Sequence, residues 1–312
     1  MDLSIPLITV LGTTAVGKTT FSARLASILD AEIISADSRQ VFKGMDIGTG
    51  KDLKEYWVNG KQIPTHLIDI AQPGTEYSVF QFQTDFCRAY SAITNKGKIP
   101  ILCGGTGLYL ESVLSGYQMV EVPNNDSLRK DLSQLSNDEL IVKLSSHRQL
   151  HNSTDTLDRE RLIRAIEIEL YKKENDRKKI GIDVQKSPVF GIRFDRKTVR
   201  SRITERLVQR LDEGMIEEVQ YLLDSGISAE KIKWYGLEYK YVAMLILGEL
   251  NKGEMFDLLN TAIHQFAKRQ MTWFRRMEKN GIMINWLEGE DGLETNLQKA
   301  LQQIEHESRA GQ

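Results

Sequence analysis

Residues 12–19 read Gly12-Thr13-Thr14-Ala15-Val16-Gly17-Lys18-Thr19 and match G-x-x-x-x-G-K-[ST], the pattern of a phosphate-binding loop. The apolar run Leu7–Leu11 before them predicts a buried strand, and apolar residues at helical spacing over Thr19–Leu29 predict a helix after them. In that setting, backbone N–H groups and the positive end of the helix dipole converge on one anion. Lys18 adds a positive charge, and the Thr19 hydroxyl is placed to ligate Mg²⁺. The stretch predicts a site for a phosphorylated ligand but leaves the reaction undefined.

The composition is that of an ordinary globular protein, with 312 residues and a formal net charge of −2. This length is enough for one large α/β domain with an insertion or a second small domain. We find no secretory signal pattern and no apolar run long enough to span a bilayer, so we expect no membrane contact. Cys87 and Cys103 fit no metal-binding spacing and indicate no disulfide framework, and we expect Cys103 to be buried. These features favour a cytoplasmic protein.

A basic segment runs from Leu157 to Arg210, with 16 Lys and Arg against 9 Asp and Glu. A local excess of positive charge is typical of a surface that binds a polyanion such as nucleic acid. The same count fits solvated helix faces on which opposite charges pair at i,i+4 spacing. The charge alone leaves both interpretations open.

Short apolar runs alternate with helical patterns along most of the chain. This alternation predicts an α/β fold, a P-loop NTPase-like parallel sheet with helices on both faces and a small all-helical insertion. The expected strands are Leu7–Leu11, Glu32–Ser35, His66–Ile70, Ile99–Cys103, Val189–Phe194 and Met283–Trp286. Expected helices between them include Thr19–Leu29, Ser78–Asn95 and Gly107–Ser115. Ligands of such sheets bind beyond the carboxyl ends of the strands, so the residues that follow each strand are the candidates for chemistry.

The pattern becomes purely helical between Val122 and Ser187. We therefore expect three parts: residues 1–121 as the first part of the core, 122–187 as a helical insertion that forms a small lid or arm, and 188–312 as the completion of the core with C-terminal helices. The expected helices of the insertion are Asp126–Leu135, Asn137–Ser146 and Thr156–Lys173, with Asp126 and Thr156 as N-caps. Later helices are expected at Lys197–Asp212, Met215–Asp224, Leu237–Leu247 and Glu254–Glu278.

Two strand ends carry candidate catalytic side chains. Asp37 follows the second strand, where a carboxylate can accept a proton from a nucleophile; a capping role in a loop is the alternative. Thr106 follows the fourth strand among Gly104, Gly105 and Gly107, which let the backbone approach a ligand closely. An ordinary N-cap is the alternative for Thr106.

Basic residues near the C-terminus suggest contacts to phosphate. Arg202 and Arg206 lie four residues apart on a predicted helix and share a face, so that they can clamp a diphosphate or form a solvated basic stripe. The stretch His264–Arg276 interleaves basic residues with aromatics, which suits contact with a nucleic-acid backbone as well as an amphipathic helix. The glycine-rich stretch Val41–Lys51 has no strand before it, so we interpret it as a structured loop near the acceptor site.

Taken together, the motifs resemble those of the tRNA dimethylallyltransferases, also called tRNA isopentenyltransferases. The resemblance runs from about Leu7 to Arg276. It rests on five motifs in order: the phosphate loop, Asp37–Thr49, His66–Ile70, Gly104–Tyr109 and Ala267–Arg275.

The resemblance implies transfer of a dimethylallyl group from dimethylallyl diphosphate to N6 of the adenosine just 3′ of the anticodon in tRNA. It implies that Mg²⁺ is required, that diphosphate is released, and that the anticodon stem-loop is the bound part of the tRNA. Asp37 would accept the N6 proton, Thr106 would position the reacting groups, and Lys18 would stabilise the leaving diphosphate. The implied contacts to tRNA are Asp37, Ser38, Arg39, Gln40, Asp126, Glu160, Arg161, Leu162, Ile163 and Arg164, and those to diphosphate are Gly12–Thr19, Arg202 and Arg206. We expect a monomer.

The sequence departs from the family's usual pattern at several places. Gly50-Lys51-Asp52 stands where the family has Ala-Lys-Pro, and Tyr56–Lys61 is an unusual addition. Trp234-Tyr235-Gly236-Leu237-Glu238-Tyr239-Lys240 stands where the family often has Ile-Gly-Tyr-Lys-Glu, and Ile263-His264 replaces Thr-Arg.

Three other functions share the phosphate loop. An adenylate isopentenyltransferase would prenylate free adenine nucleotide, with less need of a basic C-terminal helix. A small-molecule kinase would transfer a γ-phosphate and consume ATP without a prenyl donor. An RNA-binding regulator with a vestigial loop is disfavoured because Lys18, Thr19, Asp37 and Thr106 are all intact.

Overall fold

The computed structural model describes residues 5–116, 121–147, 159–174, 182 and 186–310. The chain divides into two compact units. The larger unit comprises Met1–Gly116 and Gly181–Gln312, and the smaller unit comprises Tyr117–Ile180. No helix in the described ranges is long and apolar enough to cross a membrane.

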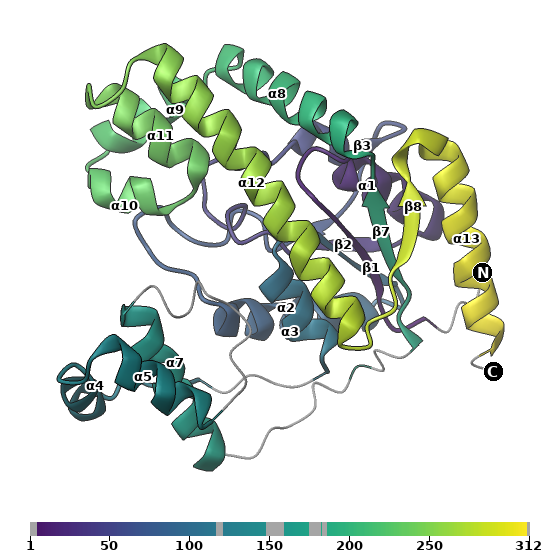
Figure 1. The fold of residues 1–312 in the computed structure, drawn as a ribbon. Coiled ribbons are helices and arrows are strands. Elements are labelled where there is room, and N and C mark those ends of the chain that lie inside the picture. Colours follow the sequence, from purple (N-terminus) through teal and green to yellow (C-terminus); the bar gives the residue numbers. More distant parts are fainter. Residues whose placement is uncertain (1–4, 117–120, 148–158, 175–181, 183–185, 311–312) are drawn as a thin grey trace. The chain divides into compact units, whose positions relative to one another are not determined.

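A six-stranded parallel sheet organises the larger unit, in the order β5-β2-β6-β1-β7-β8 (Figure 1). The strands are β1 (Ile8–Gly12), β2 (Glu32–Ser35), β5 (Thr65–His66), β6 (Pro100–Gly104), β7 (Val189–Arg193) and β8 (Asn285–Glu288). The prediction of a parallel sheet is confirmed. The expected strand His66–Ile70 is too long, because the chain turns away at Leu67 and Asp69, which both have positive φ. The last strand lies two residues later than expected.

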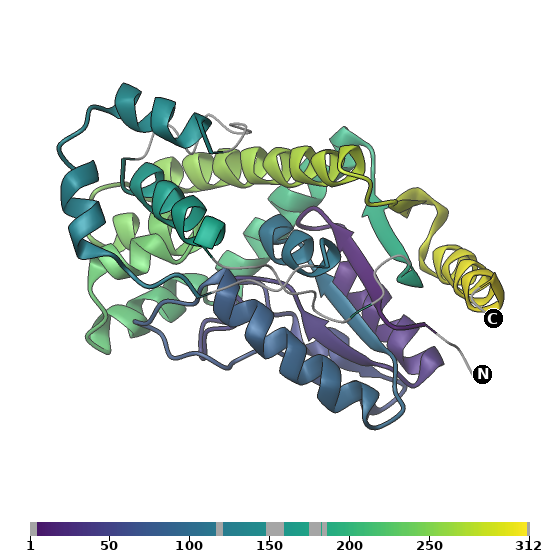
Figure 2. The same cartoon turned by 90° about the horizontal axis from the view of Figure 1, so that it is seen from below.

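Both faces of the sheet are covered, as the alternation of strand side chains requires. Ile8 and Val10 of β1 point into one core, which they share with α1 (Lys18–Leu29) and α13 (Leu293–Ala310). Helices α2 (Val79–Thr94), α3 (Gly107–Leu114) and α12 (Lys252–Lys279) cover the other face. Figures 1 and 2 show α12 running along that face, where its contacts reach both β1 and α3.

A second core lies under the C-terminal helices, around the fully buried Tyr235 and Tyr239. It joins α8 (Arg196–Asp212), α9 (Met215–Asp224), α10 (Ala229–Trp234) and α11 (Leu237–Ile246) to α12. The 28-residue α12 begins with a capping box in which Asn251 and Glu254 exchange side-chain and backbone hydrogen bonds. The sequence did not predict α10 in this core, nor α13 in the core beside β1.

The Tyr56–Lys61 addition forms most of a small hairpin that packs beside α1. Strands β3 (Trp57–Val58) and β4 (Lys61–Gln62) follow a 3₁₀ turn, η1 (Leu53–Tyr56). Asn59 and Gly60 both have positive φ, the backbone that a two-residue hairpin turn requires. Tyr56, Val58 and Ile63 are buried in the core with α1, so this addition is an integral part of the larger unit.

The smaller unit is helical, with α4 (Asp126–Leu132), α5 (Asn137–Ser145) and α7 (Arg159–Glu174) around a leucine-rich core. The prediction of Asp126 as an N-cap is wrong, because the side chain of Asn125 accepts the hydrogen bond from Leu128 N. The predicted cap at Thr156 lies outside the described residues. Burial alone would raise the pKa of Glu167, but hydrogen bonds from Arg129, Arg164 and the Asn125 backbone outweigh it and lower that pKa to about 2.

Candidate active site

The phosphate loop lies at the carboxyl end of β1 and leads directly into α1. Ala15 and Gly17 adopt positive φ, and α1 begins at Lys18. A Cβ on Gly12 would lie 2.7 Å from the Ile192 carbonyl oxygen, so the adjacent strand β7 leaves room only for glycine there. This is the strand, loop and helix geometry that the sequence motif predicts for an anion site.

Lys18 folds back over this loop, with its Nζ donating a hydrogen bond to the Thr13 carbonyl at 2.6 Å. Burial lowers the pKa of Lys18 to about 8; the charge of Arg206 adds to this decrease, and that of Asp37 opposes it. Among the described residues, the hydrogen bond of this ammonium group goes to a neutral carbonyl oxygen and not to a carboxylate. An anion in the loop would supply the opposite charge that the buried ammonium group lacks.

Three arginines of α8 follow one another at four-residue spacing and face the loops of the site. Arg202 Nε donates to the Ala15 carbonyl at 2.7 Å, and its guanidinium lies 4.7 Å from the Phe194 ring centroid. Arg206 forms an ion pair with Asp52, and Arg210 lies 3.6 Å from Glu238. Arg202 therefore already touches the phosphate loop, whereas Arg206 would have to exchange Asp52 for a bound diphosphate.

Asp37 lies just beyond the end of β2 and uses one oxygen to hold its own loop. Its Oδ1 accepts a hydrogen bond from Arg39 N at 2.9 Å, which is the capping role considered from the sequence. Its Oδ2 accepts no hydrogen bond from any described residue. One carboxylate oxygen is thus fixed in orientation, and the other stays available to a ligand.

Thr106 is the N-cap residue of α3, but its side chain makes no capping hydrogen bond. Its Oγ1 instead accepts a hydrogen bond from Ser38 N at 3.0 Å, which joins the ends of β6 and β2. These ends approach so closely that a Cβ on Gly104 would lie 2.2 Å from the Ala36 carbonyl oxygen. The structure therefore brings Thr106 next to the Asp37 loop, as the motif order suggested.

The neighbours of Asp37 are partly engaged inside the protein. Gln40 Oε1 accepts from the Ser35 hydroxyl and Gln40 Nε2 donates to the Gly50 carbonyl, each at 3.1 Å. Burial lowers the pKa of Arg39, while the charge of Asp37 opposes that shift. Arg39 lies with its guanidinium 5.2 Å from the Trp234 ring centroid.

Gln270 joins the two halves of the site, a role that the sequence did not predict. From α12, its Oε1 accepts from Thr14 N and its Nε2 donates to the Gly105 carbonyl, both at 2.9 Å. The side chain is buried, and a Cβ on Gly105 would lie only 2.5 Å from Gln270 Nε2. Because Thr14 N–H is occupied by this bond, it is not available to a diphosphate as we expected. The only sequence signal was a glutamine on the apolar face of an amphipathic helix.

The glycine-rich loop before Lys51 is held by side chains and does not form a second phosphate site. Glu218 accepts hydrogen bonds from the backbone N–H groups of Asp46, Ile47 and Gly48 at 2.7–3.0 Å. Lys51 is completely buried, donates to the Phe42 carbonyl at 2.6 Å, and pairs with Asp46 and Asp69. A carboxylate of the protein thus occupies the anion-binding backbone of this loop, consistent with the structural role that the sequence suggested.

The predicted RNA contacts of the smaller unit differ in how accessible they are. Asp126, Glu160 and Arg161 are exposed and Ile163 is partly buried. Leu162 is fully buried in the core of that unit, so its side chain has no surface to offer to RNA, and we correct that expectation. Arg164 bonds Glu167 and the Val122 carbonyl.

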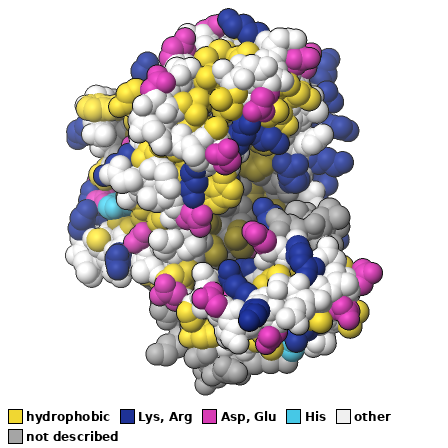
Figure 3. Space-filling model, turned by 90° about the vertical axis from the view of Figure 1, so that its left-hand side faces the viewer, with side chains coloured by type: hydrophobic (Ala, Val, Ile, Leu, Met, Phe, Trp, Pro, Cys, Tyr) yellow, Lys and Arg dark blue, Asp and Glu magenta, His cyan; other side chains and the backbone are white. Residues whose placement is uncertain are grey.

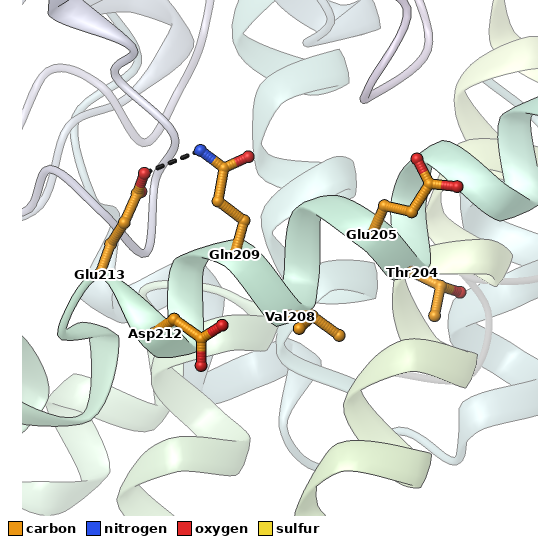
Figure 4. A pocket seen from close by; sticks show the side chains of 6 residues that line it. All are labelled: Thr204, Glu205, Val208, Gln209, Asp212 and Glu213. Atoms are coloured by element: carbon orange, nitrogen blue, oxygen red, sulfur yellow. Dashed lines mark hydrogen bonds between the residues drawn. The ribbon is translucent and has the colours of Figure 1, made fainter.

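One surface hollow lies away from these groups. It encloses about 510 Å³ and is lined by one helical surface (Figure 4): Thr204, Glu205, Val208, Gln209, Asp212 and Glu213. At 100° per residue, four of these positions, all but Gln209 and Glu213, lie on a different face of α8 from Arg202, Arg206 and Arg210. The hollow is a groove on the outer surface and not part of the candidate site.

The donor set is compatible with Mg²⁺ but does not form a cage for it. No group of three acidic, histidine or cysteine side chains in the described residues is arranged to hold a metal. Mg²⁺ often keeps several waters and binds through one or two protein oxygens plus substrate phosphates. Thr19, in the first turn of α1, is the residue that fits this arrangement.

Comparisons with known proteins agree with this geometry. The family model described as IPP transferase matches residues 40–277. The tRNA dimethylallyltransferase 2 of Bacteroides fragilis is 52% identical over 298 residues, covering 96% of this chain and 97% of that protein. That of Phocaeicola vulgatus is 55% identical over 295 residues, covering 95% and 96%.

Solved structures show the same fold. The tRNA isopentenylpyrophosphate transferase of Bacillus halodurans superposes with a TM-score of 0.70 at 30% identity and covers 98% of both chains. A eukaryotic dimethylallyltransferase acting on tRNA reaches a TM-score of 0.74 at 22% identity, over 95% of this chain and 77% of that one. The chain therefore belongs to the IPP transferase family.

Proposed function

We propose that this protein transfers a dimethylallyl group from dimethylallyl diphosphate to N6 of the adenosine 3′-adjacent to the anticodon in tRNA. The observation that carries the proposal is the Gln270 bridge, which sets the anion-binding loop beside the strand end that bears Asp37 and Thr106. A diphosphate donor and an amine acceptor can then meet in one site. The relatives named as tRNA dimethylallyltransferases support the same reaction.

The donor side stabilises the leaving group. As the allylic C–O bond breaks, its electron pair stays on the diphosphate, and negative charge increases beside Lys18 and the N–H groups at the start of α1. Preorganised donors and cations aimed at that charge lower the barrier. Arg202 and Arg206 add positive charge from α8. With Thr19 and the diphosphate oxygens as ligands, Mg²⁺ would supply further neutralisation of the departing diphosphate.

On the acceptor side, the proton of the attacking amine has to be removed. The adenine N6 amine is a weak nucleophile, and it becomes acidic as its bond to the allylic carbon forms. Asp37 Oδ2, which has no internal partner among the described residues, is placed to accept that proton. Thr106 fixes the loop of Asp37 through Ser38 and keeps the carboxylate in position. The adenine must leave its stack to reach these groups.

The exposed face of α12 suits an RNA backbone. Lys268, Arg275 and Lys279 recur at i, i+7 and i+11, opposite the buried face of the helix, and all are exposed. None of the three forms an ion pair with any residue in the described ranges. Figure 3 shows Lys and Arg side chains gathered at one edge of the face it presents. Unpaired cations of this kind contact phosphates.

Binding to the anticodon stem-loop, a monomeric state and a cytoplasmic location remain predictions. Among the alternatives, a kinase is disfavoured because the close relatives are named as tRNA dimethylallyltransferases. An adenylate isopentenyltransferase would make no use of the cationic face of α12.

We expect the protein to incorporate a prenyl group into unmodified tRNA when dimethylallyl diphosphate is supplied. Mass analysis of nucleosides from the digested tRNA should reveal adenosine that carries the added group. Parallel reactions with AMP as acceptor, and with ATP but no prenyl donor, provide the controls. Transfer to AMP alone, or consumption of ATP without a donor, would contradict the proposal.

Replacing Asp37 with Asn should abolish most turnover, because an amide keeps the cap on Arg39 N but cannot accept the N6 proton. We expect a decrease of about 10²- to 10⁴-fold in kcat. The affinity for tRNA, measured by filter binding, should change little. A variant that loses affinity and retains kcat would make Asp37 a binding residue.

Diphosphate affinity should fall as the pH rises through about 8, where Lys18 loses its proton. Bound anion stabilises the protonated ammonium group, so binding above this pH must take up a proton. The ratio of wild-type to Lys18→Arg affinity for inorganic diphosphate should decrease about tenfold from pH 7 to pH 9. Because the ligand titrates identically in both proteins, a ratio that stays constant would remove Lys18 from the anion site.

Replacing Gln270 with Leu should lower kcat by about 10²-fold while the KM values for both substrates change little. Each half of the site stays intact, but the separation between them is no longer set by the amide. Steady-state kinetics with tRNA and dimethylallyl diphosphate measure kcat and both KM values separately.

Gln83→Leu is the matched control, because Gln83 is also buried and donates to the Ser112 carbonyl, outside the site. Both variants should lose thermal stability, but only Gln270→Leu should lose kcat. Gln270→Glu keeps the acceptor for Thr14 N and loses the donor, so we expect an intermediate kcat. Equal kcat values in the two leucine variants would reduce Gln270 to a structural residue.

A further inference from the structure

We propose that Trp234 is a stacking platform for an unpaired nucleobase of the RNA substrate. The proposal rests on the proposed function and adds a contact beyond the predicted RNA-binding residues. The indole would stack on a base next to the one that reacts. The group that it recognises is the π-face of that base.

Trp234 is a large aromatic residue that lies beside the candidate active site and is exposed to solvent. It is the last residue of α10, and 49% of its surface is accessible to solvent. The next residue, Tyr235, is fully buried and contacts the indole edge-on, with centroids 5.6 Å apart at an interplanar angle of 74°. The Tyr235 hydroxyl donates to the Thr75 carbonyl at 2.8 Å. The indole is thus held at its edge while a large part of it stays open to solvent.

Two cations lie over the ring of this indole. Arg39 Cζ lies 5.2 Å and Lys231 Nζ lies 5.0 Å from the ring centroid. Lys231 also pairs with Glu76 at 3.0 Å, so part of its charge is neutralised. Arg39 forms no ion pair with a residue in the described ranges. An aromatic surface that already attracts cations matches single-stranded RNA, in which each base presents a π-face and is joined through its ribose to a phosphate.

The position of Arg39 connects this platform to the reacting groups. Its backbone N–H is held by Asp37, and a Cβ on Gly236 would lie 3.8 Å from its Nε. The Arg39 side chain therefore extends from the Asp37 loop to the segment that contains Trp234. A base flanking the adenine at Asp37 can stack on the indole, with the guanidinium beside it.

The other exposed tryptophan shows that exposure alone does not produce this arrangement. Trp57, in the hairpin, is 58% exposed, and no cation or aromatic ring of the described residues is recorded against it. Trp57 therefore provides a matched control of the same residue type in the same unit.

The test uses an unmodified RNA stem-loop with the sequence of a tRNA anticodon arm as the probe. Trp234→Ala should weaken its binding by about 5- to 150-fold, the range for loss of one base stack. Trp234→Phe should restore most of the affinity, and Trp57→Ala should bind as the wild type does. Affinity for inorganic diphosphate should be the same in all four proteins, which shows that the phosphate loop is intact.

Two further measurements separate stacking from charge. The slope of log K against log salt should be unchanged in Trp234→Ala, because no phosphate contact is lost. Stem-loops with one abasic position near the target adenosine should then locate the base. At that position, removal of the base should weaken stem-loop binding by the wild type and leave binding by Trp234→Ala unchanged.

The outcomes separate this inference from the proposed function. If the wild type binds and prenylates the stem-loop and Trp234→Ala binds equally well, the platform is refuted and the function stands. If Trp234→Ala and Trp57→Ala lose affinity equally, the effect is not stacking at Trp234 and the inference is refuted as well. If the wild type neither binds nor modifies the stem-loop, both are overturned.

Discussion

The paired hydrogen bonds of the Gln270 amide are the interaction on which the site depends. One amide satisfies a donor on the phosphate loop and an acceptor on the loop after β6, which lie 256 and 165 positions away in sequence, respectively. Since the side chain is buried, either bond left unmade would strand a polar group away from water, at a cost of about 1–3 kcal/mol. The two loops are therefore held at one separation by a helix that packs along the sheet.

Around this bridge, most charges are already satisfied by the protein itself. Glu218 and Lys51 hold the glycine-rich loop, Arg206 pairs with Asp52, and Arg210 lies beside Glu238, whose pKa is raised by burial. What stays available to a ligand is Lys18 with its lowered pKa, the outer oxygen of Asp37, and Arg202 at the phosphate loop. The site is preorganised for an anion and a proton donor. In an allylic transfer to an amine, these are the diphosphate of the donor and the amine of the acceptor.

Much of the fold was predictable because its signals are local. The phosphate loop, the parallel strands and most helices follow from short-range periodicity and from glycine at positions with positive φ. The short α10, the hairpin and α13 were missed, since two of them are brief and α13 is largely polar, with its apolar positions limited to a narrow stripe. The cap at Asn125 was misplaced by one residue, because Asn and Asp are equally good caps and sequence alone does not choose between neighbours.

The basic segment shows where sequence reasoning reaches its limit. A count of charges between Leu157 and Arg210 cannot distinguish Arg164, which bonds Glu167, from a residue that is free to meet RNA. The sequence by itself determined the phosphate loop, the sheet and the order of the chemistry-bearing motifs, since each depends on residues close together in the chain. Only the tertiary structure decided that Gln270 joins two loops, that Glu218 fills an anion-binding backbone, and that Trp234 lies beside Arg39. These contacts join residues between 165 and 256 positions apart, so they arise only when packing brings distant elements together.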